Sequence, residues 1–97
     1  GGRAVLALLR RYGGAAFAVS TEGALREVAE MATREGVFPC PESATTLAGL
    51  RMALAQGWVK PDERIVVVCT GSGLKSISAL PDPGMKIITS SAELSAA

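Results

Sequence analysis

The stretch IVVVCTGSGLK, residues 65–75, decides which fold the rest of the chain has to build. Its first five residues are all apolar and lack the polar alternation of a strand with one face in water. We therefore expect residues 65–69 to form a buried strand in a parallel sheet that is covered on both faces. The small residues after it, from Thr70 to Gly73, then form a turn at the carboxyl end of the strand. Open α/β sheets bind ligands beyond such ends.

Helical spacing and end signals predict three helices before this strand. A glycine follows each of them, Ser20 can cap the second, and Pro41 suits the first position of the third. The helices are expected over residues 3–12, 20–36 and 41–57. Two more apolar runs, at residues 15–19 and 85–89, suit strands. The order predicts an α/β fold with a partial open parallel sheet flanked by helices.

The composition limits the size and the partners of this domain. With 97 residues, the chain can form one small α/β domain over 1–97, and the polar end of the sequence predicts a weakly ordered tail over 81–97. Ten basic and nine acidic residues give a net charge of +1 without a run of one sign. We therefore expect neither nucleic acid nor an anionic membrane as a partner.

The residue types that are missing narrow the chemistry and the location. The chain has no histidine, and its two cysteines, Cys40 and Cys69, are not spaced as metal ligands. We predict no metal site, and we interpret the cysteines as reduced, buried thiols of a cytosolic protein. The sequence predicts neither a signal peptide nor a membrane span, since no apolar run approaches about 18 residues. A cytoplasmic location is therefore expected.

The turn after the predicted strand is a candidate site with an ordinary alternative. Thr70 offers a hydroxyl that can donate and accept, and the glycines beside it allow backbone amides to approach a ligand. The same composition also suits a plain turn from a strand to a helix. Two phosphate-binding motifs fail, because Leu74 stands at the glycine of a P-loop and Ser76 at the last glycine of a dinucleotide fingerprint.

Residues 35–76, EGVFPCPESATTLAGLRMALAQGWVKPDERIVVVCTGSGLKS, resemble the C-terminal part of threonine synthases. These are pyridoxal-phosphate enzymes of the tryptophan-synthase-β fold type, also called fold type II. The resemblance rests on the EGxFPxPE segment, the PDER turn and TGSGLK, which follow one another at separations like those of the family, and it extends over about residues 3–76. It implies a C-terminal fragment of the large cofactor-binding domain of such an enzyme.

The resemblance also implies roles for particular residues. A hydroxyl at the end of a late strand bonds the pyridine nitrogen of the cofactor in this fold type, and the matching residue here is Thr70. Gly71 and Ser72 would flank that contact, and Glu42 matches a segment that lines the cofactor side of the cleft. Glu42 equally suits a first-turn acid that stabilises the helix dipole. For Lys75 we expect a solvated surface charge.

The lysine that holds the cofactor in this family lies well upstream, in a motif resembling Ser-Phe-Lys-Asp, as does the loop that binds the cofactor phosphate. None of the three lysines of this chain, Lys60, Lys75 and Lys86, stands in such a context. We therefore predict no catalytic residue in the chain, no activity of the chain alone, and no stable binding of pyridoxal phosphate to it. In the full-length enzyme the substrate would be O-phosphohomoserine, converted with water to threonine and phosphate.

The predicted strand at residues 65–69 is expected to have exposed edges in a chain of this size. An apolar strand at residues 65–69 needs neighbours that a chain of this size supplies only in part, so we predict self-association.

One alternative function is another β-family enzyme, such as a threonine dehydratase, which the same turn would serve. The other is a non-catalytic α/β binding module, because a fold alone does not fix a function.

Overall fold

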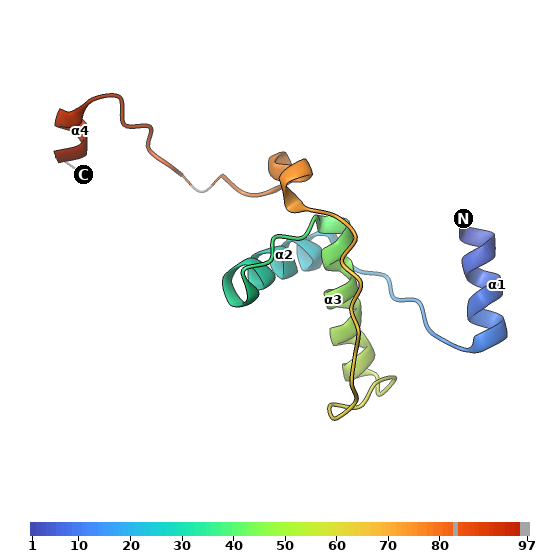
Figure 1. Cartoon of the computed structure of the whole chain (residues 1–97). Helices are drawn as coiled ribbons and strands as arrows, with labels where there is room; N and C mark the ends of the chain where they lie inside the picture. The colour runs from blue at the N-terminus through green and yellow to red at the C-terminus, as the bar shows by residue number, and fades with distance from the viewer. Residues whose placement is uncertain (83, 96–97) are drawn as a thin grey trace.

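The computed structural model describes residues 1–82 and 84–95, and it consists of helices joined by extended segments (Figure 1). The three predicted helices are confirmed, with ends that differ from the predictions by one or two residues. A short 3-10 helix follows the predicted turn, and a last short helix lies near the C-terminus. The elements are α1 (Gly2–Tyr12), α2 (Thr21–Glu35), α3 (Pro41–Ala55), η1 (Gly73–Ala79) and α4 (Ser91–Ser95).

Local signals in the sequence set the ends of these helices. The Ser20 side chain accepts a hydrogen bond of 3.0 Å from the Gly23 amide and so caps α2. Gly36 ends α2 in the left-handed region, at a φ of 67°, where a side chain would be strained. Pro41 stands in the first turn of α3, where its missing N–H leaves no helical bond unmade.

The predicted parallel sheet is not confirmed, because the structure has no strand among the described residues. The segments 15–19, 65–69 and 85–89 are extended, but they do not pair with one another. Among residues 1–82 and 84–95 the one β-type pairing is an isolated antiparallel bridge between Pro39 and Ser72. A strand needs a neighbour for its backbone N–H and C=O groups, and the three segments lie apart in Figure 1. Val66, predicted to be buried, is 89% exposed.

The packed part of the chain is the contact between α2 and α3. Small or medium side chains fill it, which lets the two helices approach each other closely. The buried apolar residues are Ala24, Val28, Cys40, Ala44 and Ala53. The core is therefore small and excludes the apolar segment 65–69.

An ion pair also joins these two helices. Glu27 of α2 is buried, and its carboxylate accepts two hydrogen bonds from the guanidinium of Arg51 on α3, the longer of them 3.2 Å. The hydrogen bond with Glu27 and the charge of its carboxylate raise the pKa of Arg51. A buried carboxylate without such a partner would be strongly destabilising, so the pair fixes how α2 lies on α3.

Two glycines let the turn after residue 69 lie against the start of α3. A Cβ at Gly71 would come within 2.7 Å of Cys40 Sγ, and one at Gly73 would come within 2.7 Å of the Phe38 ring. Real Cβ atoms essentially never approach so closely. The turn and the segment before α3 therefore pack at a distance that only glycine permits at these positions.

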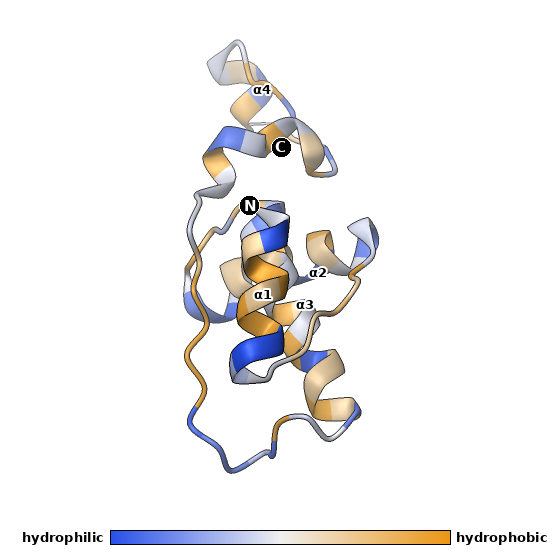
Figure 2. Ribbon diagram, turned by 90° about the vertical axis from the view of Figure 1, so that its right-hand side faces the viewer, coloured by the Kyte–Doolittle hydropathy of each residue, from blue (hydrophilic) through white to orange (hydrophobic). Residues whose placement is uncertain are grey.

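Outside this packed part, the chain is extended. Its radius of gyration is 18.5 Å, whereas a compact domain of about 100 residues has about 13 Å. Helix α1 has no buried residue and lies apart from α2 and α3 in Figure 1. Figure 2 shows the apolar residues of α1 and of the segment leading to η1 on the outside of the molecule. Much of the apolar surface is thus left uncovered.

The C-terminal region from residue 81 is only partly described. Residues 83, 96 and 97 of the predicted weakly ordered tail lie outside the described residues. The Glu93 carboxylate of α4 accepts a hydrogen bond of 2.9 Å from the amide of Thr89, which precedes the helix. Within the described parts of the chain, no helix is both long and apolar enough to cross a membrane.

The close approach at Gly73 generates a stability prediction. Gly73→Ala should lower the free energy of unfolding by about 1 to 3 kcal/mol, because the added methyl group overlaps the Phe38 ring. Urea unfolding followed by far-ultraviolet circular dichroism would measure this loss.

Gly49→Ala is the matched control. Its Cβ would meet Phe17 Cβ at 3.9 Å, an ordinary contact. Because Gly49 lies inside α3, this change should raise stability by about 0.5 to 1 kcal/mol through helix propensity. Equal effects of the two substitutions would contradict the predicted close packing at Gly73.

Candidate functional site

The candidate site forms where the turn at residues 70–73 meets the start of α3. The Cys40 amide donates a hydrogen bond of 2.9 Å to the Gly71 carbonyl, and the Gly73 amide donates one of 2.8 Å to the Phe38 carbonyl. These bonds flank the isolated bridge between Pro39 and Ser72. Segments about thirty positions apart in the sequence are thereby joined backbone to backbone.

Ser43 lies at the centre of this junction. Its side chain is buried in the first turn of α3, with 3% of the residue exposed. Ser43 Oγ accepts hydrogen bonds from the amides of Thr70, at 3.1 Å, and Gly71, at 3.0 Å. It also lies 3.5 Å from Thr70 Oγ1 and 3.3 Å from Cys40 Sγ. One hydroxyl therefore contacts two of the three residues of the turn that the sequence singles out, Thr70 and Gly71.

The predicted site residues of the turn have different surroundings. Thr70 is exposed, with its hydroxyl close to Ser43 and its other side open to solvent. Gly71 approaches Cys40 too closely to carry a side chain. The Ser72 hydroxyl accepts a hydrogen bond of 3.2 Å from the Leu74 amide and so caps η1. Thr70 is thus the residue of the turn whose side chain is best placed to contact a ligand.

Glu42, the fourth predicted residue, is exposed in the first turn of α3, next to Ser43. Its pKa is lowered, first by a hydrogen bond with its own backbone, then by one with the Cys40 side chain, with a small contribution from the charge of Lys75. These contacts favour the charged carboxylate. The structure therefore places Glu42 beside the junction and keeps it ionised, as a first-turn acid of a helix is expected to be.

The sequence gives Ser43 no hydrogen-bonding role of its own, although the structure puts it at the centre. Its partners lie 27 and 28 positions away, so no local pattern reveals them. One signal was present: Ser43 precedes Ala44 on the face of the helix that carries Leu47 and the other apolar residues. A small polar residue beside a buried stripe needs a hydrogen-bond partner.

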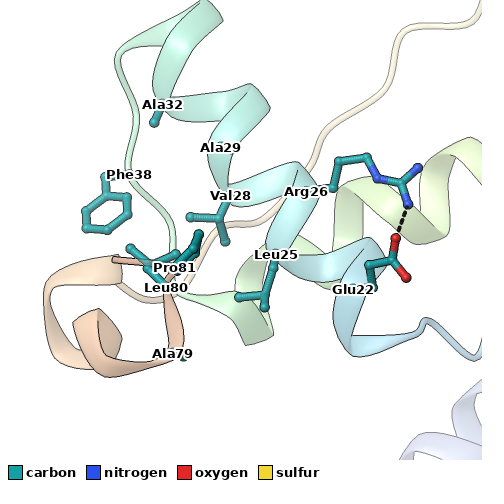
Figure 3. Close-up of a pocket in the computed structure, with 10 residues that line it drawn as sticks. All are labelled: Glu22, Leu25, Arg26, Val28, Ala29, Ala32, Phe38, Ala79, Leu80 and Pro81. Carbon is teal, nitrogen blue, oxygen red and sulfur yellow. Dashed lines mark hydrogen bonds and ion pairs between the residues drawn. The ribbon is translucent and has the colours of Figure 1, made fainter. Parts of the chain in front are cut away.

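A large hollow of the described chain lies elsewhere. It is an apolar groove of about 820 Å³ between α2 and the end of η1, and none of the predicted site residues lines it. Figure 3 shows Val28 and Leu25 on one side, Leu80 and Pro81 on the other, and the Glu22–Arg26 ion pair at one end. Large apolar pockets are the usual first candidates for a site, but this one lacks converging polar groups. The predicted site residues therefore lie at the junction or beside it, and not in this groove.

Metal binding has no support in the described residues. Among them, no group of three or more histidine, cysteine or acidic side chains could hold a metal ion. Both cysteines are free; Cys40 is buried as predicted, whereas Cys69 is exposed, contrary to the prediction. The exposure of Cys69 follows from the missing sheet, since it ends the segment that was expected to be a buried strand.

Comparisons with known proteins agree with the motifs of the sequence. The chain is 43% identical over 67 residues to threonine synthase of Methanocaldococcus jannaschii, which covers 69% of this chain and 16% of that protein. It is 40% identical over 70 residues to threonine synthase of Mycobacterium tuberculosis, covering 72% of this chain and 18% of the relative. Cysteate synthase of Methanospirillum hungatei is 46% identical over 39 residues, 40% of this chain and 9% of that enzyme.

The matched region thus spans less than a fifth of the length of these relatives. No solved structure matches the chain. The profile of one family, described as "Pyridoxal-phosphate dependent enzyme", matches residues 1–71, which is well over half of the chain and includes Glu42, Thr70 and Gly71. The chain therefore belongs to the family of pyridoxal-phosphate dependent enzymes, and the threonine synthases are among its relatives.

Proposed function

We propose that this chain is the C-terminal part of a threonine synthase and supplies the side of the cofactor site that contacts the pyridine nitrogen. The full-length enzyme would convert O-phosphohomoserine and water to threonine and phosphate. The observation that supports this role is the Thr70 hydroxyl, which is exposed while the Thr70 amide is anchored to Ser43. The similarity to threonine synthases supports the choice of reaction.

The residues of the turn fit one edge of an aromatic nitrogen heterocycle. Pyridoxal phosphate, when bound, withdraws electrons from the substrate and stabilises a carbanion. The Thr70 hydroxyl would bond the ring nitrogen, and as a neutral group it would promote protonation of that nitrogen less than a carboxylate does. Gly71 and Ser72 would flank the contact. The ionised Glu42 would line the same side of the cleft, beside Ser43.

The two alternatives from the sequence stay open. One is another pyridoxal-phosphate reaction, such as threonine dehydration; the similarity over 39 residues to a cysteate synthase shows that part of the matched sequence is not confined to threonine synthases. Assays of the full-length protein with O-phosphohomoserine and with threonine distinguish these reactions. A non-catalytic binding module is the second alternative, and a parent gene without an upstream Ser-Phe-Lys-Asp-like motif would favour it.

The first functional prediction concerns Thr70 in the full-length protein. Thr70→Ala should weaken the binding of pyridoxal phosphate about three- to tenfold, because a hydrogen bond of about 0.5 to 1.5 kcal/mol is lost. Thr70→Ser should restore affinity, since it keeps the hydroxyl. A titration of the apoprotein followed by absorbance measures the affinity.

Thr45→Ala is the control for this experiment. It also removes a hydroxyl from this region, but that hydroxyl donates locally to the Glu42 carbonyl at 2.6 Å. We expect unchanged cofactor affinity in this variant. If Thr70→Ala bound the cofactor as tightly as the Thr45→Ala control, the proposed contact would be refuted.

The second functional prediction concerns the chain of 97 residues by itself. Mixed with pyridoxal phosphate and reduced with borohydride, its lysines should be labelled no more than free lysine is, and the chain should release no phosphate from O-phosphohomoserine. The reason is that none of its three lysines stands in the motif that the family uses. Mass spectrometry after reduction checks the first point, with free lysine at matched concentration as the reference. A single lysine labelled in full would contradict the prediction.

The third functional prediction is self-association of the isolated chain. Its extended segment 65–69 leaves Val66 89% exposed and offers an unpaired backbone edge, and an edge of this kind can pair with a second copy. Sedimentation velocity should show dimers or larger species at micromolar concentration. Val66→Lys should shift the distribution toward the monomer, because a charge at an exposed edge opposes pairing.

Gln56→Lys adds the same charge at an exposed site outside the apolar segment and serves as the control. It should leave the association unchanged. A monomeric parent chain, or equal effects of the two lysine variants, would argue against association through this segment.

A further inference from the structure

The hydrogen-bonding capacity of Ser43 is the starting point. A serine hydroxyl has one proton to donate and two lone pairs that accept. The amides of Thr70 and Gly71, at 3.1 and 3.0 Å, and the Cys40 thiol, at 3.3 Å, all donate to this oxygen and occupy its lone pairs. Ser43 is buried, so solvent offers no competing partners. What remains of its capacity is the single O–H, which must act as a donor.

Two neighbouring atoms compete for the Ser43 proton. Cys40 Sγ lies at 3.3 Å and Thr70 Oγ1 at 3.5 Å from Ser43 Oγ. Sulfur is a weak acceptor, whereas a hydroxyl oxygen is a good one. The Cys40 thiol is also the donor in this contact, since it gives its own proton to Ser43 Oγ. These preferences direct the Ser43 proton to Thr70 Oγ1.

We infer that Ser43 is a positioning residue for the Thr70 hydroxyl, an inference that rests on the proposed function. Its oxygen holds the backbone of the turn through two amides, and its proton points to Thr70 Oγ1. The Thr70 hydroxyl then keeps its own proton for a ligand on its exposed side. The 3.5 Å separation is long for two hydroxyls. The amide bonds therefore supply most of the restraint, and the contact between the hydroxyls orients the proton.

In this arrangement the position of the Thr70 hydroxyl depends on α3, the helix that carries Ser43. Ser43 belongs to the first turn of α3, and α3 is fixed against α2 by the core and by the Glu27–Arg51 ion pair. Thr70 lies on an extended segment that has no sheet partner among the described residues. Ser43 thus transfers the rigidity of the helix pair to the ligand-facing hydroxyl.

The test is a double-mutant cycle in the full-length protein that contains this chain. Ser43→Ala removes the hydroxyl, and Ser43→Cys keeps nearly the same volume with a weak acceptor, so that one variant is expected to fold. Thr45→Ala is again the control. Hydrogen exchange of the segment containing the Thr70 and Gly71 amides is measured without and with cofactor, and cofactor affinity is measured in the Thr70 and Thr70→Ala backgrounds.

We expect Ser43→Ala and Ser43→Cys to speed exchange of these amides about tenfold or more, with the control unchanged. Either variant should weaken cofactor binding about three- to tenfold when Thr70 is present and have no further effect in the Thr70→Ala background. Unchanged amide exchange, or losses of affinity that add, would overturn the inference and leave the Thr70 contact intact. Faster exchange together with full affinity of Thr70→Ala would overturn the contact itself, and the inference with it.

Discussion

Two hydrogen bonds to one buried oxygen connect the extended half of this chain to its helices. Ser43 Oγ accepts the Thr70 and Gly71 amides, and beside it the backbone bonds of Cys40 and Gly73 hold the turn against the start of α3. The Ser43 oxygen is buried, and a buried polar group without a partner would cost about 1 to 3 kcal/mol. The turn amides therefore give the Ser43 oxygen its hydrogen-bond donors, and Ser43 gives these amides an acceptor. The missing side chains of Gly71 and Gly73 allow the two segments to come this close.

This junction, rather than a sheet, positions the candidate site. In a doubly wound fold the carboxyl end of a strand would be placed by neighbouring strands on both edges. Here the segment 65–69 has no such neighbours among the described residues, and the turn nevertheless occupies a defined place. The position of Thr70 thus depends on α3, through the hydrogen bond of its amide to Ser43.

The sequence predicted what depends on neighbouring residues and missed what depends on distant ones. Ser20, Gly36 and Pro41 marked the ends of α2 and α3, because capping and left-handed geometry are local. The apolar runs suggested strands, yet pairing needs a partner backbone that no run can specify by itself. The choice of Thr70 and Glu42 came from the family resemblance and stays a prediction, whereas the partners of Ser43 became visible only with the fold in place.

The exposed apolar surface of the chain lies next to the candidate site, so covering that surface would also affect the site. Val66 and Ile87 are 89% and 82% exposed, and α1 has no buried residue, so among the described residues little apolar burial beyond the core between α2 and α3 opposes the entropy of ordering the chain. An apolar run of this kind is stable when both faces and both edges are covered. Covering residues 65–69 would also exclude water from around Thr70, and a hydrogen bond is stronger in such surroundings. The same contacts that would complete the fold would therefore strengthen the bond between the Thr70 hydroxyl and a ligand.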